Sequence, residues 1–148
     1  MYCEKMNIYR QRSAQFIVTF VCIILLLFSV ITGDYLFLGA TTVFVLGVHL
    51  YARSLDYTIE HTADALVFGL CRKHTVLLEE IEEMTIENLD YVGKFGGYGY
   101  RRFRRKHAYV FSDSGDFLCV KTANKDYFLS IKDKNYWKNW LEKQSECL

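Results

Sequence analysis

Three things are scarce in this sequence: proline, net charge, and charged residues between positions 13 and 52. The chain of 148 residues has no proline, and its 18 basic and 17 acidic residues leave a formal net charge of +1. Glycine and Asx residues must therefore make the tight turns. Domains that bind nucleic acid in general are usually basic throughout, so the balanced charge argues against a nucleic-acid partner.

The cysteines and histidines form no metal or disulfide pattern. The five cysteines are odd in number and scattered, which makes a poor disulfide framework and lacks the close spacing of zinc ligands. A reducing compartment fits this usage. The four histidines are also isolated in the sequence. We therefore predict no metal site and no cofactor.

Two long runs lack charged residues altogether. Residues 13–33 and 35–52 contain no Asp, Glu, Lys or Arg, and Asp34 is the one charge between them. As helices they would be roughly 31 Å and 27 Å long, close to the ~30 Å hydrocarbon layer of a bilayer. The sequence predicts two membrane-spanning helices joined by a short turn at residues 32–34.

Two other interpretations of these runs are weaker. Two helices that are apolar on every face would need a large soluble protein to bury them, and only 96 residues follow residue 52. A cleaved signal peptide would have a shorter apolar region with a small-residue cleavage site after it, and it would leave the second run unexplained.

Basic residues flank the two runs on one side. Lys5, Arg10 and Arg12 precede the first run and Arg53 follows the second, whereas the turn has no basic residue. Positive flanks prefer the cytoplasm, so we expect a multi-pass membrane protein with both termini cytoplasmic. We place the tail and the hairpin in residues 1–54 and a cytoplasmic domain in residues 55–148.

The second domain has the pattern of short strands. Runs rich in Val, Ile, Phe and Tyr are separated by turn residues, which predicts about seven strands. These runs are residues 57–61, 65–71, 75–78, 83–88, 106–112, 116–122 and 126–131. We expect the last three to form consecutive hairpins across residues 113–115 and 123–125. Residues 79–89 are ambiguous between helix and strand, and residues 88–99 are predicted to be a glycine-rich loop.

A final helix is predicted from Asp133, which is a suitable N-cap. Four apolar side chains then share one face that should pack on the sheet. They are Tyr136, Trp137, Trp140 and Leu141.

The second domain also resembles a known family. Residues 97–103 (GYGYRRF), 107–112 (HAYVFS) and 127–131 (YFLSI) are similar to segments of the bacterial pleckstrin-homology-like (PH-like) domain proteins, many of which place two membrane helices before the domain. The resemblance implies an α+β, mainly β fold: seven antiparallel strands in two sheets that curve into a partly open barrel, closed by a C-terminal helix. It also implies the bacterial cytoplasmic membrane as location, and it supplies no catalytic residues.

The strongest functional feature is a basic run that follows Lys94. This basic run comprises Arg101, Arg102, Arg104, Arg105 and Lys106. We expect Phe103, which interrupts it, to point inward. In one interpretation the run and Lys94 contact anionic lipid head groups or a phosphorylated ligand. In the other, the run pairs in a neighbouring antiparallel strand with an equally dense acidic run. The acidic run comprises Glu79, Glu80, Glu82, Glu83, Glu87 and Asp90.

The second apolar run carries Gly39 and Gly47 on one face, two helical turns apart. Small residues allow close helix packing, so this face is expected to pack either on the first helix or on another copy in a homo-oligomer.

No catalytic pattern stands out. The glycines of residues 93–99 lack the Gly-Lys-Ser/Thr ending of a phosphate-binding loop, and residues 113–116 supply too few oxygen ligands for calcium. We therefore expect a binding or scaffold module, not an enzyme, whose cytoplasmic domain engages a protein partner or anionic head groups of the bilayer. The alternative is a small accessory subunit of a transporter or other membrane complex that acts through its hairpin.

Overall fold

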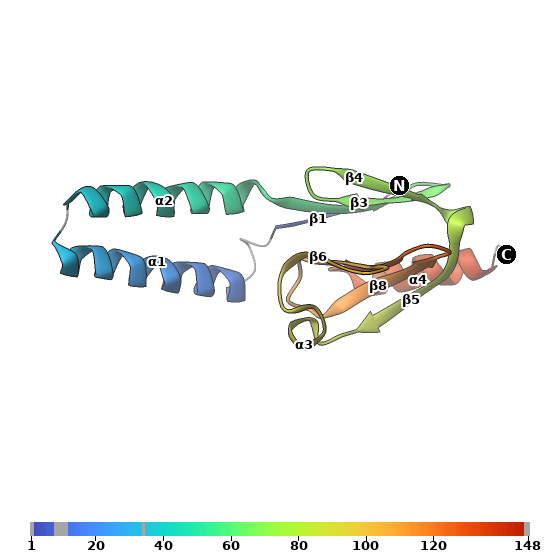
Figure 1. Ribbon diagram of the computed structural model, residues 1–148. Coiled ribbons are helices and arrows are strands. Elements are labelled where there is room, and N and C mark those ends of the chain that lie inside the picture. Colours follow the sequence, from blue (N-terminus) through green and yellow to red (C-terminus); the bar gives the residue numbers. More distant parts are fainter. Residues whose placement is uncertain (1, 8–11, 34, 147–148) are drawn as a thin grey trace. The chain divides into compact units, whose positions relative to one another are not determined.

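The computed structural model describes residues 2–7, 12–33 and 35–146. The chain divides into two compact units, one formed by Asn7–Leu55 and the other by residues within 1–6 and 56–148. The first unit is helical and the second is built from strands and helices (Figure 1).

The helical unit consists of α1 (Arg12–Thr32) and α2 (Tyr35–Ser54). Both helices are long and apolar enough to cross a membrane, which confirms two apolar N-terminal helices. Their side chains are apolar around the whole helix circumference, as in helices that are buried or cross a membrane. Gly33 ends α1 with a φ of 67°, a backbone conformation that glycine adopts without strain.

Polar side chains join α1 to α2 at one level. Ser29 Oγ lies 3.1 Å from Thr41 Oγ1, and both residues are buried between the helices. Each hydroxyl also donates to the carbonyl four residues earlier in its own helix. Gly39 and Gly47 are exposed on the other side of α2, with nothing within 4 Å of an added Cβ. Packing of these glycines on α1 was therefore a wrong prediction, and packing on another copy stays a prediction.

Sheet A has the strand order β1-β2-β3-β4. Its strands are β1 (Tyr2–Asn7), β2 (Asp56–His61), β3 (Ala65–Gly69) and β4 (Lys73–Leu77). β2 and β3, and β3 and β4, pair antiparallel. The N-terminal strand β1 was not predicted, because the sequence assigns this segment only as a tail to the first membrane helix. A short 3₁₀ helix, η2 (Leu78–Glu80), leads from β4 to sheet B.

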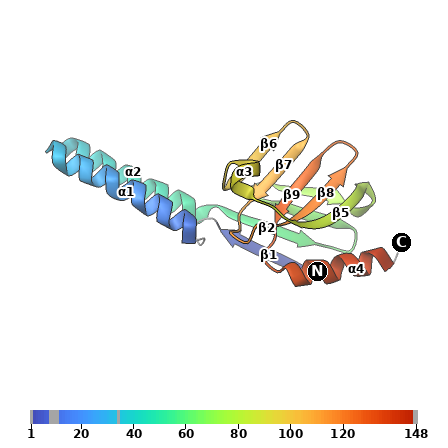
Figure 2. The ribbon, with the colours of Figure 1, turned by 90° about the horizontal axis from the view of Figure 1, so that it is seen from below.

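Sheet B has the strand order β5-β8-β9-β7-β6 (Figure 2). Its strands are β5 (Ile81–Asn88), β6 (Gly99–Phe103), β7 (Lys106–Val110), β8 (Asp116–Thr122) and β9 (Asp126–Ser130). The hairpin β8–β9 is confirmed, and the ambiguous stretch 81–88 is a strand. The predicted pairing of residues 106–112 with 116–122 is wrong. Because β5 and β9 occupy both edges of β8, β7 pairs instead with β9, and it does so in parallel.

The two sheets pack face to face around an aromatic core. Tyr57 of β2 stacks on Phe111, with ring centroids 4.9 Å apart, and Phe68 of β3 contacts the rings of Tyr109 and Tyr127. Alternate residues of β2 point into this core, as the period of a strand requires. The described residues after α2 form eight strands in two sheets, which agrees with the expected count of about seven. The sheets do not close into a barrel, and β7 and β9 pair in parallel, which differs from the expected antiparallel pattern.

The C-terminal helix α4 (Lys134–Glu146) packs on this unit as predicted. Trp137 and Trp140 are buried, and Asp133 caps the helix by accepting a hydrogen bond from Tyr136 N at 3.0 Å. Glu4 of β1 adds a second cap from a distant part of the sequence. Its carboxylate accepts from Lys132 N and Asp133 N, both at 2.9 Å.

We predict that Glu4→Gln destabilises the second unit, because a neutral amide oxygen replaces a buried carboxylate that accepts two main-chain hydrogen bonds. The expected loss is about 1–3 kcal/mol, measured as a lower midpoint in thermal or urea unfolding of the full chain in detergent. Glu142→Gln is the control, because its ion pair with Lys138 is exposed on α4. Equal midpoints for the two variants would contradict the capping role.

Candidate anion-binding surface

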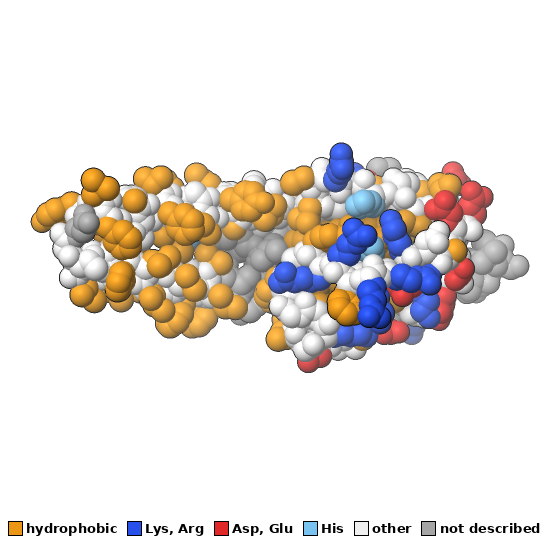
Figure 3. All heavy atoms as spheres, in the orientation of Figure 1, with side chains coloured by type: hydrophobic (Ala, Val, Ile, Leu, Met, Phe, Trp, Pro, Cys, Tyr) orange, Lys and Arg blue, Asp and Glu red, His pale blue; other side chains and the backbone are white. Residues whose placement is uncertain are grey.

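The basic run forms the end of the β6–β7 hairpin. Arg101 and Arg102 lie on β6, Arg104 and Arg105 make the turn, and Lys106 begins β7. Arg104 has a φ of 53°, in the left-handed region, and this tight turn places the flanking cations close together. Figure 3 shows Lys and Arg side chains gathered on one face of the second unit.

The basic run and the acidic run are not neighbours. β5, which carries half of the acidic run, and β6 are the opposite edges of sheet B, with three strands between them. Among the described residues, no carboxylate lies within 4.0 Å of the charged nitrogens of Arg101, Arg102 or Arg104. The interpretation in which the two runs pair within one chain is therefore wrong.

Arg105 differs from the rest of the run. Its Nε donates to Asn124 O at 3.1 Å and its Nη2 donates to Ala123 O. Asp126 N also donates to Arg105 O at 2.9 Å. Arg105 thus ties the β6–β7 turn to the β8–β9 turn, and its guanidinium is engaged by main-chain carbonyls.

Phe103 points outward, contrary to the prediction. Its side chain is 70% exposed, and the Arg104 guanidinium lies 5.9 Å from the ring centroid. The strand period explains the difference, because Phe103 shares a face of β6 with Arg101, whereas Tyr100 faces Tyr109 on the core side. The hairpin therefore presents an apolar ring among cations.

Lys94 comes from a short helix where the sequence predicted only a loop. This helix, α3 (Tyr91–Phe95), is capped by Asp90, whose carboxylate accepts from Val92 N and Gly93 N. It covers part of the outer face of sheet B, where Phe95 contacts Phe117 and Phe128. Lys94 Nζ lies 5.4 Å from the Phe128 ring centroid, so the ammonium stays at the edge of this apolar cluster.

Together these elements form a pocket of about 410 Å³ between α3 and the β6–β7 hairpin. Its apolar side chains are Phe95, Phe103 and Ala108. Its cationic side chains are Lys94, Arg101, Arg102 and Lys106. A pocket lined by both apolar and cationic side chains is suited to a group that is both apolar and anionic. Of the cationic residues proposed from the sequence, the two turn residues Arg104 and Arg105 do not line the pocket.

A histidine that the sequence did not single out lies behind this surface. His107 is buried on the core side of β7, and its Nδ1 lies 2.7 Å from Tyr100 Oη. Burial lowers the pKa of His107 from its ordinary 6.5, and the charges of Lys125 and Arg102 act in the same direction. The alternation of side chains along β7 could have predicted that His107 faces the core, because His107 and the core residue Tyr109 share a face of the strand.

The unit also contains a buried cysteine. Burial raises the pKa of Cys119 on β8 to about 11, so this thiol stays protonated at neutral pH. Within the described part of the chain, no three His, Cys, Asp or Glu side chains are grouped to hold a metal ion.

Comparison with known proteins gives no assignment. No family model matches the chain, and no curated protein or solved structure matches it.

We predict that the second unit loses stability in mild acid, partly through His107. The pKa of His107 is lower in the folded state than in the unfolded state, where it is near 6.5. The contribution of neutral His107 to folding stability is therefore fully present above the unfolded pKa. It is lost as the pH falls through the folded pKa. The measurement is the unfolding midpoint of the full chain at about pH 7 and about pH 5. His107→Gln should reduce the difference between the two midpoints.

His61→Gln is the companion variant, since burial lowers the pKa of His61 as well. The two reductions should add, because the histidines lie in different sheets. An unchanged pH dependence in His107→Gln would contradict the assignment.

Proposed function

We propose that this chain is a membrane-anchored binding module whose second unit contacts anionic phospholipid head groups through the basic hairpin end. The observation that carries the proposal is the exposed group of Arg101, Arg102 and Arg104, which has no carboxylate partner within 4.0 Å among the described residues, around exposed Phe103. In this proposal α1 and α2 are the anchor.

Charge and polarity both favour a bilayer surface over a free anion. The cytoplasmic leaflet is rich in anionic lipids, and each basic residue near it contributes about 1 kcal/mol. Aromatic rings such as Phe103, exposed beside cations, are stable at the boundary between head groups and acyl chains. The positive flanks of the helices support a cytoplasmic location for the second unit.

The resemblance to the PH-like domain proteins supports the same proposal. Two facing sheets with a C-terminal helix agree with it at a coarse level. The parallel pair β7–β9 departs from the all-antiparallel pattern that the family implies. Membership in that family, and a bacterial cytoplasmic membrane as location, are therefore parts of the proposal.

The test uses the full chain in nanodiscs of neutral lipid and measures binding to anionic vesicles at low salt. Replacing Arg101, Arg102 and Arg104 by Gln removes three cations, so we expect the affinity to fall roughly a hundredfold. Arg105 is kept, because it holds the two turns together. The matched control replaces Lys132, Lys138 and Lys143 by Gln, which removes the same charge near and on α4.

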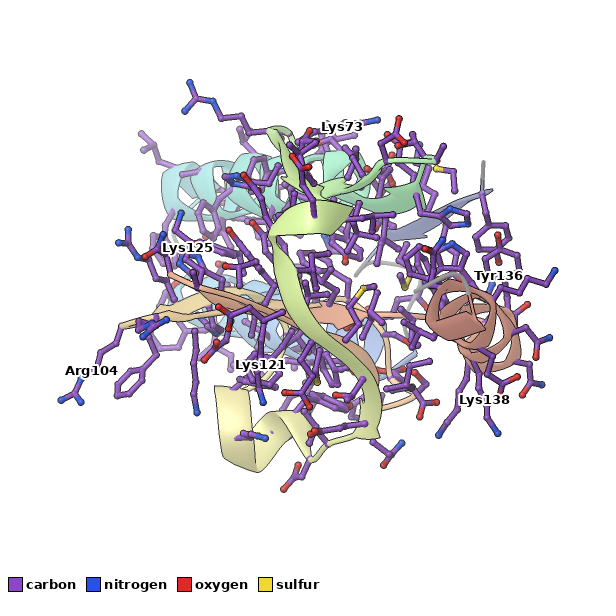
Figure 4. The ribbon with its side chains drawn as sticks, turned by 90° about the vertical axis from the view of Figure 1, so that its right-hand side faces the viewer. Lys73, Arg104, Lys121, Lys125, Tyr136 and Lys138 are labelled. Atoms are coloured by element: carbon purple, nitrogen blue, oxygen red, sulfur yellow. The ribbon has the colours of Figure 1, made fainter. Side chains whose placement is uncertain are left out.

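Figure 4 shows why this control is informative, since Arg104 and Lys138 project from opposite ends of the second unit. The control should bind almost as well as the unchanged chain. Equal losses in both variants would indicate adsorption by net charge alone, and no loss in either would remove the lipid proposal.

A second candidate, an accessory subunit that acts through its hairpin, is favoured by one observation. Gly39 and Gly47 lie open on the side of α2 away from Ser29 and Thr41, where a partner helix could approach closely. Replacing both glycines by Leu should then abolish co-purification of a partner complex in mild detergent, whereas the arginine variant should not. Retained co-purification would exclude this candidate.

A further inference from the structure

The two edge strands of sheet B carry opposite charges. β5 contributes Glu82, Glu83 and Glu87 and has no basic residue, whereas β6 contributes Arg101 and Arg102 and has no acidic one. In Figure 4, β5 crosses the front of the second unit and no other strand or helix lies in front of it. Sheet A has no such contrast, because Lys5 of its edge strand β1 and Lys73 of its edge strand β4 are paired with Asp56 and Glu60.

The side chains of the two edges lie in common rows across the outer face. Following the strand registers, one row runs from Arg101 through Ala108, Phe128 and Cys119 to Thr85. On β5 the neighbours of Thr85 on that face are Glu83 and Glu87. A second copy placed in line with the first would therefore bring Arg101 between two carboxylates.

The strand directions also fit such an arrangement. β6 is antiparallel to β7, β7 is parallel to β9, and β9 and β5 are both antiparallel to β8. β5 and β6 consequently run in opposite directions. When a copy is repeated in line, its β5 meets the β6 of the preceding copy as an antiparallel neighbour, with the outer faces on the same side.

We propose that a second copy of this chain docks β5 against β6, extending sheet B from one copy to the next. Charge selects this pairing over the alternatives, because β5 against β5 sets carboxylates together and β6 against β6 sets guanidinium groups together. Charged edge strands normally prevent sheets from pairing edge to edge. Here the charges oppose only the pairing of β5 with β5 and of β6 with β6.

The contact is head-to-tail, so each added copy leaves one acidic and one basic edge exposed. Such an interface gives a chain of copies, not a closed pair. A single strand pair is a small contact, and anchoring in a bilayer would strengthen it by raising the local concentration. This inference goes beyond the proposed lipid contact and does not depend on it.

Charge reversal at each edge provides the test. The full chain in non-ionic detergent at low salt is followed by sedimentation, and its mean mass should rise with concentration past that of a dimer. Glu82→Lys with Glu87→Lys reverses β5 and leaves Glu83, which bonds Lys121, in place. Arg101→Glu with Arg102→Glu reverses β6. Each pair of substitutions should weaken association more than tenfold.

The decisive variant combines all four substitutions in one chain. It exchanges the two edges, so it should associate like the original chain, and an equimolar mixture of the two singly reversed chains should do so as well. Lys138→Glu with Lys143→Glu on α4 is the control and should have no effect. Lack of recovery in the four-fold variant, with its unfolding midpoint unchanged, would overturn the proposal, as would a mass that stops at a dimer.

The β5 reversal also separates this inference from the proposed function. It leaves the basic run intact, so vesicle binding from neutral nanodiscs should persist while self-association is lost. If the arginine variant loses vesicle binding, the lipid contact is retained. If the β5 reversal associates as well as the original chain, the docking of copies is rejected.

Discussion

The surface of the second unit depends on the fact that β8 has a strand on each side. β5 occupies one edge of β8 and β9 the other, so β7 is displaced to the far edge of β9 and carries β6 with it. This order separates the acidic run from the basic run by the full width of the sheet. Charges that would neutralise each other in adjacent strands are left as two distinct surfaces.

Fixed main-chain contacts then hold the basic surface in shape. The guanidinium of Arg105 donates hydrogen bonds to the main-chain carbonyls of the β8–β9 turn. These bonds position Arg104 and Phe103 at the end of the β6–β7 hairpin. On the outer face, Phe95 and Phe128 anchor α3 and hold Lys94 at the margin of an apolar pocket. One arginine of the run thus has a structural role, and this allows the others to face solvent.

Sequence patterns predicted the local elements well and the long-range pairing poorly. Charge-free runs and strand periods reflect single segments, so both helices, most strands and the N-cap at Asp133 were predictable. The parallel pairing of β7 depends on which edges of β8 are already occupied, which no local pattern records. β1 and its Glu4 cap join residues about 130 positions apart. The basic residues were predictable as a group, but the distinct role of Arg105 and the outward direction of Phe103 follow from the tertiary pairing.

The two surfaces have different consequences for a chain held in a bilayer. Head groups and a second copy would both contact Arg101 on β6. Head groups would contact it together with Arg102 and Arg104, and a second copy would contact it together with the main-chain edge of β6. Salt screens exposed charge pairs strongly, whereas main-chain hydrogen bonds between strands are screened little. The proposed lipid contact should therefore weaken first as ionic strength rises, and the proposed strand docking should be the more persistent of the two. If both proposals hold, the second unit would contact lipid through its cations and would also join neighbouring copies into a row along the membrane.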